Sequence, residues 1–482
     1  MDWFGAPDYW LSRLVFQRAL AAVYLVAFLA AANQFRALLG ERGLLPVPRY
    51  LAEVPFRRAP SLFHLHYSDR FFAAVAWTGV ILSAATVVGL TERAPLWAAM
   101  LVWAVLWVLY LSIVNVGQRW YAFGWESLLL EAGFLAIFLG NARTAPPVLV
   151  LWLMRWLLFR VEFGAGLIKL RYDPCWRNLT CLDYHHETQP MPGPLSWFFH
   201  RLPGPLHRTE VAANHFTQLV APIAIFFPQP VAGIAAGVVI VTQLWLVLSG
   251  NFALLNWLTI AIAIPALGDS VLRSVLGPVL PATPPELAAS PTWHQGAVLA
   301  LTVVVVVLSV WPVRNMASRH QVMNYSFDPF RLVNTYGAFG NINRRRYEVV
   351  VEGTDEAEVG PQTVWREYGF KGKPGDPRRR PPQVAPYHLR LDWQMWFIPM
   401  SARFARPWFI RFVGALLRGD RMILKLLRSN PFPETPPTFV RARLYHYRFT
   451  SWAERRATGA WWERNLVGEY LQPVSLRETS TP

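Results

Sequence analysis

The feature that most constrains this chain is a series of long apolar stretches within its first 311 residues. An apolar helix of about 20 residues is long enough to cross the hydrocarbon core of a bilayer. Five stretches are clear, at residues 14–32, 71–90, 96–114, 231–249 and 295–311. Four are weaker, at residues 127–139, 148–170, 215–227 and 252–267. Because lipid-exposed backbone must form its hydrogen bonds internally, and these runs are too apolar for barrel strands, we predict a polytopic α-helical membrane bundle of about nine transmembrane helices.

The composition agrees with a lipid environment for much of the chain, since 54% of its residues are hydrophobic and only 16% are charged. The formal net charge of +16 is unevenly distributed. From Trp311 to the end there are 27 Lys and Arg against 15 Asp and Glu, whereas the part before it has 19 against 15. A basic excess suits contact with anionic lipid headgroups. An arginine-rich surface exposed to water also accounts for the excess, so nucleic acid binding is not needed to explain it. We therefore expect the lipid bilayer as a partner and no nucleic acid.

The last third of the chain has the pattern of a water-exposed domain. We divide the chain into a bundle at residues 1–311, with loops at 33–70 and 171–214, and a basic extramembrane domain at 312–482. This C-terminal domain is predicted to be a β-rich α/β domain. Apolar and polar residues alternate over 387–397, which is the period of a half-buried strand. Further strands are expected at 349–351 and 440–444, and a helix at 408–427.

One predicted span, residues 148–170, contains Arg155, Arg160, Glu162 and Lys169. Each charge in the middle of a membrane costs several kcal/mol unless it is paired or hydrated. Three of the four recur at seven-residue steps, so they share one side of a helix that must face the bundle interior or a cavity. One interpretation is a polar pocket in which Lys169 acts as a base or a cation. The other, which we favour, is a structural network in which carboxylates pair with the cations, with partners in the preceding span at Glu126 and Glu131.

Two cysteines, Cys175 and Cys181, follow the charged span directly. Two cysteines are too few for a disulfide scaffold or a four-cysteine zinc site, but they can form one bridge that closes a short loop. We predict this disulfide. A metal site could instead be drawn from Asp183, His185, His186 and Glu187. Since adjacent histidines seldom ligate one ion together, we expect no metal.

Several longer strings of residues resemble the lipase maturation factor family. In the first two thirds they are GERGLLP at 40–46, HYSD at 66–69, GWESLLLE at 124–131, FGAGLIK at 163–169, HHETQP at 185–190, and the residues at 249–252 and 256–259. In the last third they are residues 325–343, RYEVVVEG at 346–353 and PYHLRLDW at 386–393. The resemblance covers nearly the whole chain, and strings of this length are specific.

The resemblance implies a membrane factor that assists the folding or assembly of exported client proteins such as lipases. In animals, family members are in the endoplasmic reticulum membrane, with a cytosolic N-terminus and the C-terminal domain in the lumen. The positive-inside rule would instead place the arginine-rich loops and C-terminal domain in the cytoplasm, although it is weak for long segments. The resemblance and the cysteine pair both favour the far side of the membrane. Residues 475–482 contain no retention signal, and we expect this chain in a bacterial inner membrane.

The predicted role is that of a chaperone-like factor and not of an enzyme, and we expect no cofactor. Aromatic residues dominate the energetics of protein interfaces, so we expect client contacts at Trp365, Tyr368, Trp393, Trp396 and Phe397. The alternative is that these residues build the core of the domain, which we favour for Trp393, whereas Trp396 breaks the strand alternation and is the stronger candidate for a contact. A fainter similarity, confined to residues 163–170 and Trp176, points to the transmembrane domain of the vitamin K-dependent carboxylase. That alternative would make Lys169 the catalytic base of a membrane enzyme.

Overall fold

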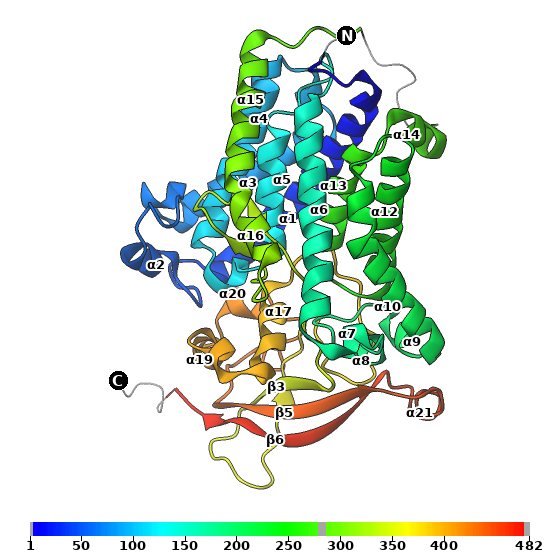
Figure 1. Cartoon of the computed structure of the whole chain (residues 1–482). Coiled ribbons are helices and arrows are strands. Elements are labelled where there is room, and N and C mark those ends of the chain that lie inside the picture. The colour runs from blue at the N-terminus through cyan, green and yellow to red at the C-terminus, as the bar shows by residue number, and fades with distance from the viewer. Residues whose placement is uncertain (1–2, 278–285, 477–482) are drawn as a thin grey trace.

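A helical bundle stands on a small antiparallel sheet in the computed structural model, which describes residues 3–277 and 286–476 (Figure 1). Within these residues, five helical segments are long and apolar enough to cross a membrane. They are α1 (Trp10–Leu38), α3 (Asp69–Val87), α4 (Leu96–Val116), α12 (Val231–Ser249) and the pair α15 (Thr292–Leu308) and α16 (Val310–Ala317). These five coincide with the five clear apolar stretches. The predicted helical bundle with a C-terminal sheet domain is confirmed, whereas a count of nine spanning helices is not.

The four weaker stretches also form helices, but none combines the required length with low charge. They correspond to α5 (Gly124–Ala136), α6 (Val148–Arg171), α10 (Gly204–Leu219) followed by α11 (Ala221–Ala224), and α13 (Leu255–Ala263). The stretch at 215–227 is interrupted at Val220, because Pro222 has no N–H for a continuous helix. With 24 residues, α6 is about 36 Å long and passes through the bundle (Figure 1). It is long enough to cross a membrane, but its charged residues exclude it from the helices that are also apolar enough to do so.

Close packing of small residues holds the bundle together around α1 and α3. A Cβ built at Gly79 on α3 would lie 2.4 Å from the ring of Phe28 on α1, so only glycine allows this approach. Small residues at such crossings are typical of helix pairs in membranes, where dispersion contacts replace the hydrophobic effect. The ring of Phe28 in turn packs edge-on against Tyr110 of α4. The crossing therefore fixes three of the apolar helices relative to one another.

The two long loops and the C-terminal domain lie toward the same end of the bundle, opposite the N-terminus (Figure 1). The first loop carries α2 (Val47–Glu53), and the second carries α7 (Pro174–Arg177), α8 (Leu182–Thr188) and α9 (Ser196–His200). Arg411 of the C-terminal domain donates a hydrogen bond to the carbonyl of Leu44 in the first loop, at 2.9 Å. Arg346 donates to the carbonyls of Glu187 and Gln189 in the second loop. Both loops are therefore part of the platform on which the sheet domain rests.

The sheet has four antiparallel strands in the order β4-β3-β5-β6, and a separate two-stranded ladder joins β1 to β2. The strands are β1 (Tyr325–Ser326), β2 (Asn334–Thr335), β3 (Arg346–Thr354), β4 (Arg366–Glu367), β5 (Phe439–Phe449) and β6 (Trp462–Val474). Val349 of β3 lies opposite Leu444 of β5. The strands predicted at 349–351 and 440–444 are thus confirmed, and they are neighbours in the sheet.

Two predictions for the C-terminal domain are corrected by the structure. Residues 387–397 do not form a strand, because α17 (Arg390–Phe397) is a helix. The alternation was misleading because the polar residues of α17 are buried as well, with Asp392 accepting hydrogen bonds from the backbone of Gly372 and Lys373. The helix predicted at 408–427 is divided into α19 (Trp408–Leu417) and α20 (Arg421–Leu424). Gly419 takes a positive φ of 64° between them, and Asp420 caps the second helix.

Short elements complete the described chain. The remaining α-helices are α14 (Asp269–Leu276), α18 (Ala402–Ala405) and α21 (Trp452–Thr458). Single 3-10 turns are η1 (Pro7–Tyr9), η2 (Leu62–His64), η3 (Thr91–Arg93), η4 (Gln118–Tyr121), η5 (Ile264–Ala266) and η7 (Ile398–Met400).

Candidate functional site

A cavity of about 930 Å³ lies where the bundle meets the C-terminal domain. Much of its wall comes from α6, α10, α12, α13, the segment 323–341 and α17, which are far apart in the sequence but adjacent at this end of the bundle (Figure 1). Residues of 119–128, α7, α8 and α18 also line it. The lining is mostly apolar and aromatic, with a few polar groups gathered on α6 and its neighbours. Ligand pockets typically have volumes of about 300–1,000 Å³ and this kind of lining, so the cavity is the principal candidate site.

Lys169 on α6 provides the cavity with a buried cation. Its Nζ donates hydrogen bonds to Asn214 Oδ1 at 2.9 Å and to Gln218 Oε1 at 2.8 Å, and it lies 4.7 Å from the ring centroid of Trp176. Both hydrogen-bond partners are neutral amides from α10. Within the described residues, no carboxylate lies within 4.0 Å of this ammonium group. The expected pairing of Lys169 with a carboxylate is therefore not found, and the side chain borders an open cavity instead of a packed core.

Glu162 lies two helical turns before Lys169 and also lines the cavity. Gln243 of α12 donates a hydrogen bond to Glu162 Oε1 at 2.8 Å, and Asn256 of α13 donates to the carbonyl of Gln243. Arg155, two further turns away, hydrogen-bonds to the hydroxyl of Tyr9 near the opposite end of the bundle. The three residues expected on one side of a helix do follow α6. Arg155 has a partner of its own, whereas Glu162 and Lys169 share Gln218 and act on each other electrostatically.

Arg160 and Glu131 form a fully buried ion pair between α6 and α5. Glu131 also accepts hydrogen bonds from Tyr336 Oη at 2.7 Å and from the backbone N–H of Asn334 at 3.0 Å. Arg160 in turn donates to the carbonyl of Asn334 at 2.7 Å. The pair predicted within the bundle therefore also fixes the segment that leads from the last apolar helix into the sheet domain. Hydrogen bonds of this kind are what make a buried charge pair tolerable, although Arg160 Nε has no partner among the described residues.

Glu126, the other carboxylate of α5, pairs with the C-terminal domain instead of with α6. Arg390 of α17 donates a hydrogen bond to Glu126 Oε1 at 2.7 Å, and both side chains are fully buried. Tyr110 donates a short hydrogen bond to the same carboxylate, and His388 Nδ1 lies 3.5 Å from it. Burial and the positive charge of Arg390 lower the pKa of His388 to about 4, although Glu126 opposes the shift. His388 is therefore neutral at pH 7.

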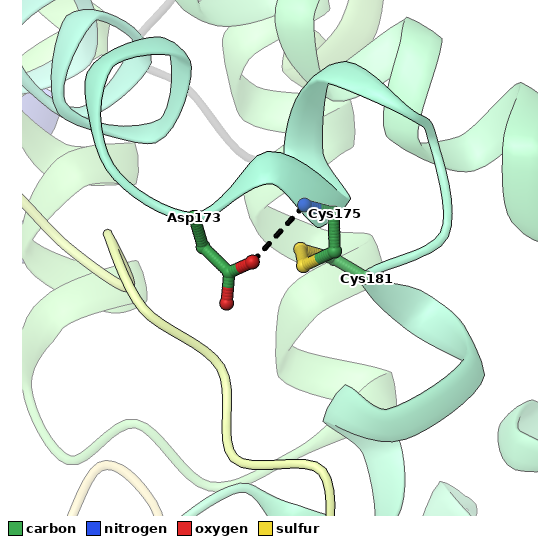
Figure 2. Close-up of side chains that lie close together, drawn as sticks. All are labelled: Asp173, Cys175 and Cys181. Carbon is green, nitrogen blue, oxygen red and sulfur yellow. Dashed lines mark hydrogen bonds between the residues drawn. A yellow bond between two sulfur atoms is a disulfide. The ribbon is translucent and has the colours of Figure 1, made fainter.

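A disulfide joins Cys175 to Cys181 directly after α6 (Figure 2). Asp173 beside it accepts the N–H of Cys175 at 3.0 Å and a hydrogen bond from Arg344 at 2.7 Å. Burial acts to raise the pKa of Asp173, but these bonds and the N–H of Ile342 outweigh it and bring the pKa down to about 2. Asp173, beside the bridge, thus connects the end of α6 to Ile342 and Arg344 of the C-terminal domain.

The same cluster of Asp173, Cys175 and Cys181 has the spacing of possible metal ligands. Both sulfur atoms are in the disulfide, however, and the carboxylate holds Arg344, so this set does not suit an ion. The residues of the alternative metal site have separate partners. Asp183 hydrogen-bonds to His207 at 3.1 Å, and His185 at the cavity wall lies parallel to the ring of Phe252 and edge-on to that of Phe339. Burial, followed by the charges of His186 and Lys169, lowers the pKa of His185 to about 3.

The five aromatic residues expected to contact a client fall into two groups. Tyr368 and Trp393 are only 3% exposed and belong to the core, although Trp393 also lines the cavity. Trp365 is covered by the guanidinium of Arg441, 4.0 Å from its ring centroid. Trp396 and Phe397 are half-buried and line the cavity. The indole of Trp396 also donates a hydrogen bond to the carbonyl of Thr188, which connects α17 to α8.

Several residues of the site were not predicted from the sequence, among them Phe404, Asn214 and Gln218. Phe404 lines the cavity, is 38% exposed and packs against Phe397 with ring centroids 5.3 Å apart. Asn214 and Gln218 hold Lys169. Their i, i+4 spacing places both amides on one side of α10, and this spacing is the signal that could have identified them. Phe404 carries no such signal.

Two family models match the chain in sequence order. One describes the lipase maturation factor transmembrane domain and matches residues 11–274, and the other describes the lipase maturation factor C-terminal domain and matches residues 332–472. The chain belongs to the lipase maturation factor family. The family resemblance drawn from the sequence strings is therefore confirmed. Together with the five apolar helical segments, membership identifies an integral membrane protein.

Curated lipase maturation factors align with the chain over almost its full length. Lipase maturation factor 1 of Bos taurus is 43% identical over 511 aligned residues, which cover 98% of this chain and 90% of that protein. Lipase maturation factor 1 of Homo sapiens is 40% identical and covers 98% of the chain, and human lipase maturation factor 2 is 29% identical and covers 97%. No solved structure matches the chain at a significant level. The carboxylase alternative receives no support from these relatives.

Proposed function

We propose that this lipase maturation factor family member assists the folding or assembly of exported lipases and is not itself an enzyme. The observation that carries the proposal is the similarity to lipase maturation factor 1, which extends through the bundle and the sheet domain without a large missing part. The proposed setting is a bacterial inner membrane. The proposed topology has about nine crossing helices within residues 1–311 and an extramembrane domain at 312–482 on the non-cytoplasmic side, together with the disulfide loop.

The way in which the sheet domain is attached to the bundle supports this role. Arg390 reaches the buried Glu126 of α5, and Asn334 reaches the Glu131–Arg160 pair. A domain held at several buried polar contacts keeps a fixed orientation to the bilayer, unlike a domain on a free linker. A client that emerges from the membrane would therefore meet the same surface in every encounter.

The proposed client contact is the aromatic edge of the cavity on α17 and the chain that follows it. Phe397 and Phe404 are partly exposed there, with Trp396 beside them. Exposed aromatic residues at the edge of a pocket bury a large area at low entropic cost when a partner binds. Tyr368 and Trp393 are buried in the core of this domain, and the guanidinium of Arg441 covers the ring of Trp365. We therefore leave these three residues out of the proposed contact surface.

A complementation experiment tests the proposed function. A host that lacks this chain is given an exported lipase together with the wild-type chain or an empty vector, and the activity per mass of exported lipase is measured. We expect the ratio to rise at least several-fold with the chain, while total synthesis of the lipase is unchanged. An equal ratio in both strains for the lipases of the native host would contradict the proposal.

The client contact is tested with a matched pair of variants. Phe404→Ala removes a ring that is 38% exposed at the cavity edge, and Phe56→Ala removes one that is 52% exposed in the first loop. We expect only Phe404→Ala to lower the yield of active lipase, because both rings contribute little to the core. Equal yields from the two variants, with normal expression, would remove the aromatic edge from the proposed contact surface.

A further inference from the structure

We propose that the cavity is a binding site for an acidic lipid, with an alkyl chain against its apolar wall and a carboxylate or phosphate headgroup at Lys169. This inference concerns a ligand of the protein itself and does not depend on any client. It is based on three features of the site: an opening toward the lipid-facing side of α12, a cation held by neutral groups, and a volume suited to one amphiphile.

The cavity opens sideways onto the surface that α12 presents to lipid. Val241 of α12 lines the cavity and is 67% exposed, and Trp245, one turn later, lines it too and is partly exposed. Since α12 is long and apolar enough to span a membrane, its exposed face lies against acyl chains. Trp245 donates a hydrogen bond to Glu210, the arrangement expected of an indole at the boundary between hydrocarbon and headgroups. A lipid can therefore enter without passing through water.

Lys169 provides the group that selects for charge. An ammonium group has three N–H donors, and two of them are used by the amide oxygens of Asn214 and Gln218. A buried cation is stabilised far better by an anion than by amides alone, and among the described residues no carboxylate lies within 4.0 Å of it. An anionic headgroup at the cavity end of Lys169 would complete this site through a charge-assisted hydrogen bond.

Glu162 determines which end of the cavity takes the headgroup. It lies seven residues before Lys169 on α6, about 10 Å along the helix, and lines the cavity as well. Glu162 shares Gln218 with Lys169, and in its ionised form it repels an anion, which favours a headgroup on the side of Lys169 that faces away from it. The alkyl chain then follows the apolar wall toward Val241. The volume of about 930 Å³ is more than a small free anion needs and is suited to one long-chain amphiphile.

The test is a binding measurement on the full chain in nanodiscs of zwitterionic phosphatidylcholine. Isotope-labelled oleic acid is titrated, and oleyl alcohol, which has the same chain and no charge, is titrated in parallel. We expect saturable binding of one oleate per chain, with at least tenfold weaker binding of the alcohol. Equal affinity for acid and alcohol, or oleate binding that does not saturate, would overturn the proposal even without any variant.

Two variants locate the site. Lys169→Met removes the charge in the cavity, and Lys425→Met removes the charge of an exposed lysine in the C-terminal domain. Oleate should bind at least tenfold more weakly to Lys169→Met and unchanged to Lys425→Met. If Lys169→Met retains wild-type affinity, the cavity is not the site.

A second arm distinguishes the source of the acidic group. Native mass spectrometry is applied to protein transferred from phosphatidylcholine nanodiscs to nanodiscs that contain phosphatidylglycerol. Retention of one phosphatidylglycerol that displaces oleate identifies a phospholipid as the ligand, whereas oleate that stays bound identifies a free fatty acid. Displacement of oleate by inorganic phosphate alone would show a simple anion site and overturn the role of the alkyl chain.

Discussion

The buried ion pair between Arg390 and Glu126 predicts how firmly the sheet domain is attached to the bundle. Both side chains are fully buried, and Arg390 also donates a hydrogen bond to the carbonyl of Trp120. Replacing Arg390 with Met keeps an unbranched apolar stem, though a shorter one, and leaves the carboxylate buried without its cation. Breaking a buried pair in this way costs about 3–5 kcal/mol. Because Tyr110 still donates to Glu126, we expect the lower end, about 3 kcal/mol.

The assay is equilibrium unfolding in mixed micelles, with limited proteolysis of the C-terminal domain as a second measurement. The control is Arg49→Met, which breaks an exposed pair with Glu53 and should change little, because water screens such pairs. The double variant Arg390→Met with Glu126→Leu removes the orphaned charge and should recover part of the loss. The reasoning would be refuted if Arg390→Met lowered the free energy of unfolding by less than about 1 kcal/mol. It would also be refuted if the double variant lost as much free energy of unfolding as the two single variants added together.

Three further predictions concern stability. The disulfide closes a short loop, so Cys175→Ser with Cys181→Ser should lower the free energy of unfolding by about 2 kcal/mol, and reduction of the wild type should have the same effect. His388 has a pKa of about 4 when folded and about 6.5 when unfolded, so the unfolded chain binds the proton first as pH falls. The free energy of unfolding should drop by about 3 kcal/mol between pH 7 and pH 4 because of this group. His388→Gln should remove that contribution to the pH dependence. Gly79→Ala places a methyl group against the ring of Phe28 and should cost about 1–3 kcal/mol by thermal or denaturant unfolding.

The apolar helices were predictable because membrane crossing depends on local length and composition alone. Five of the stretches reappear as helices long enough to span, and the strands at 349–351 and 440–444 reappear as neighbours in the sheet. The strand predicted at 387–397 failed for a reason that is not local. Arg390 in α17 is buried against Glu126, which is 264 residues away in the sequence, and such a partner is invisible to a periodicity argument.

The site was predictable only in part for the same reason. The charges of α6 identified a polar interior, and Glu131, which pairs with Arg160, was one of two partners expected in the preceding apolar stretch. The cavity beside Lys169 could not be predicted, because its walls come from parts of the chain that are far apart in the sequence. The neutral amides of Asn214 and Gln218 that replace the expected carboxylate lie on another helix. Their role depends on the packing of α10 against α6 and not on any motif.

The measurement that tests the proposed role most directly is site-specific photocrosslinking during lipase export. A photoreactive phenylalanine analogue is placed at position 404, at the aromatic edge of the cavity, or at position 56 in the first loop as the control. The proposal predicts a covalent adduct between position 404 and the newly exported lipase, formed before the lipase becomes active, and little adduct from position 56. Adducts of equal yield from both positions, or none from position 404 in cells that still mature the lipase, would contradict it.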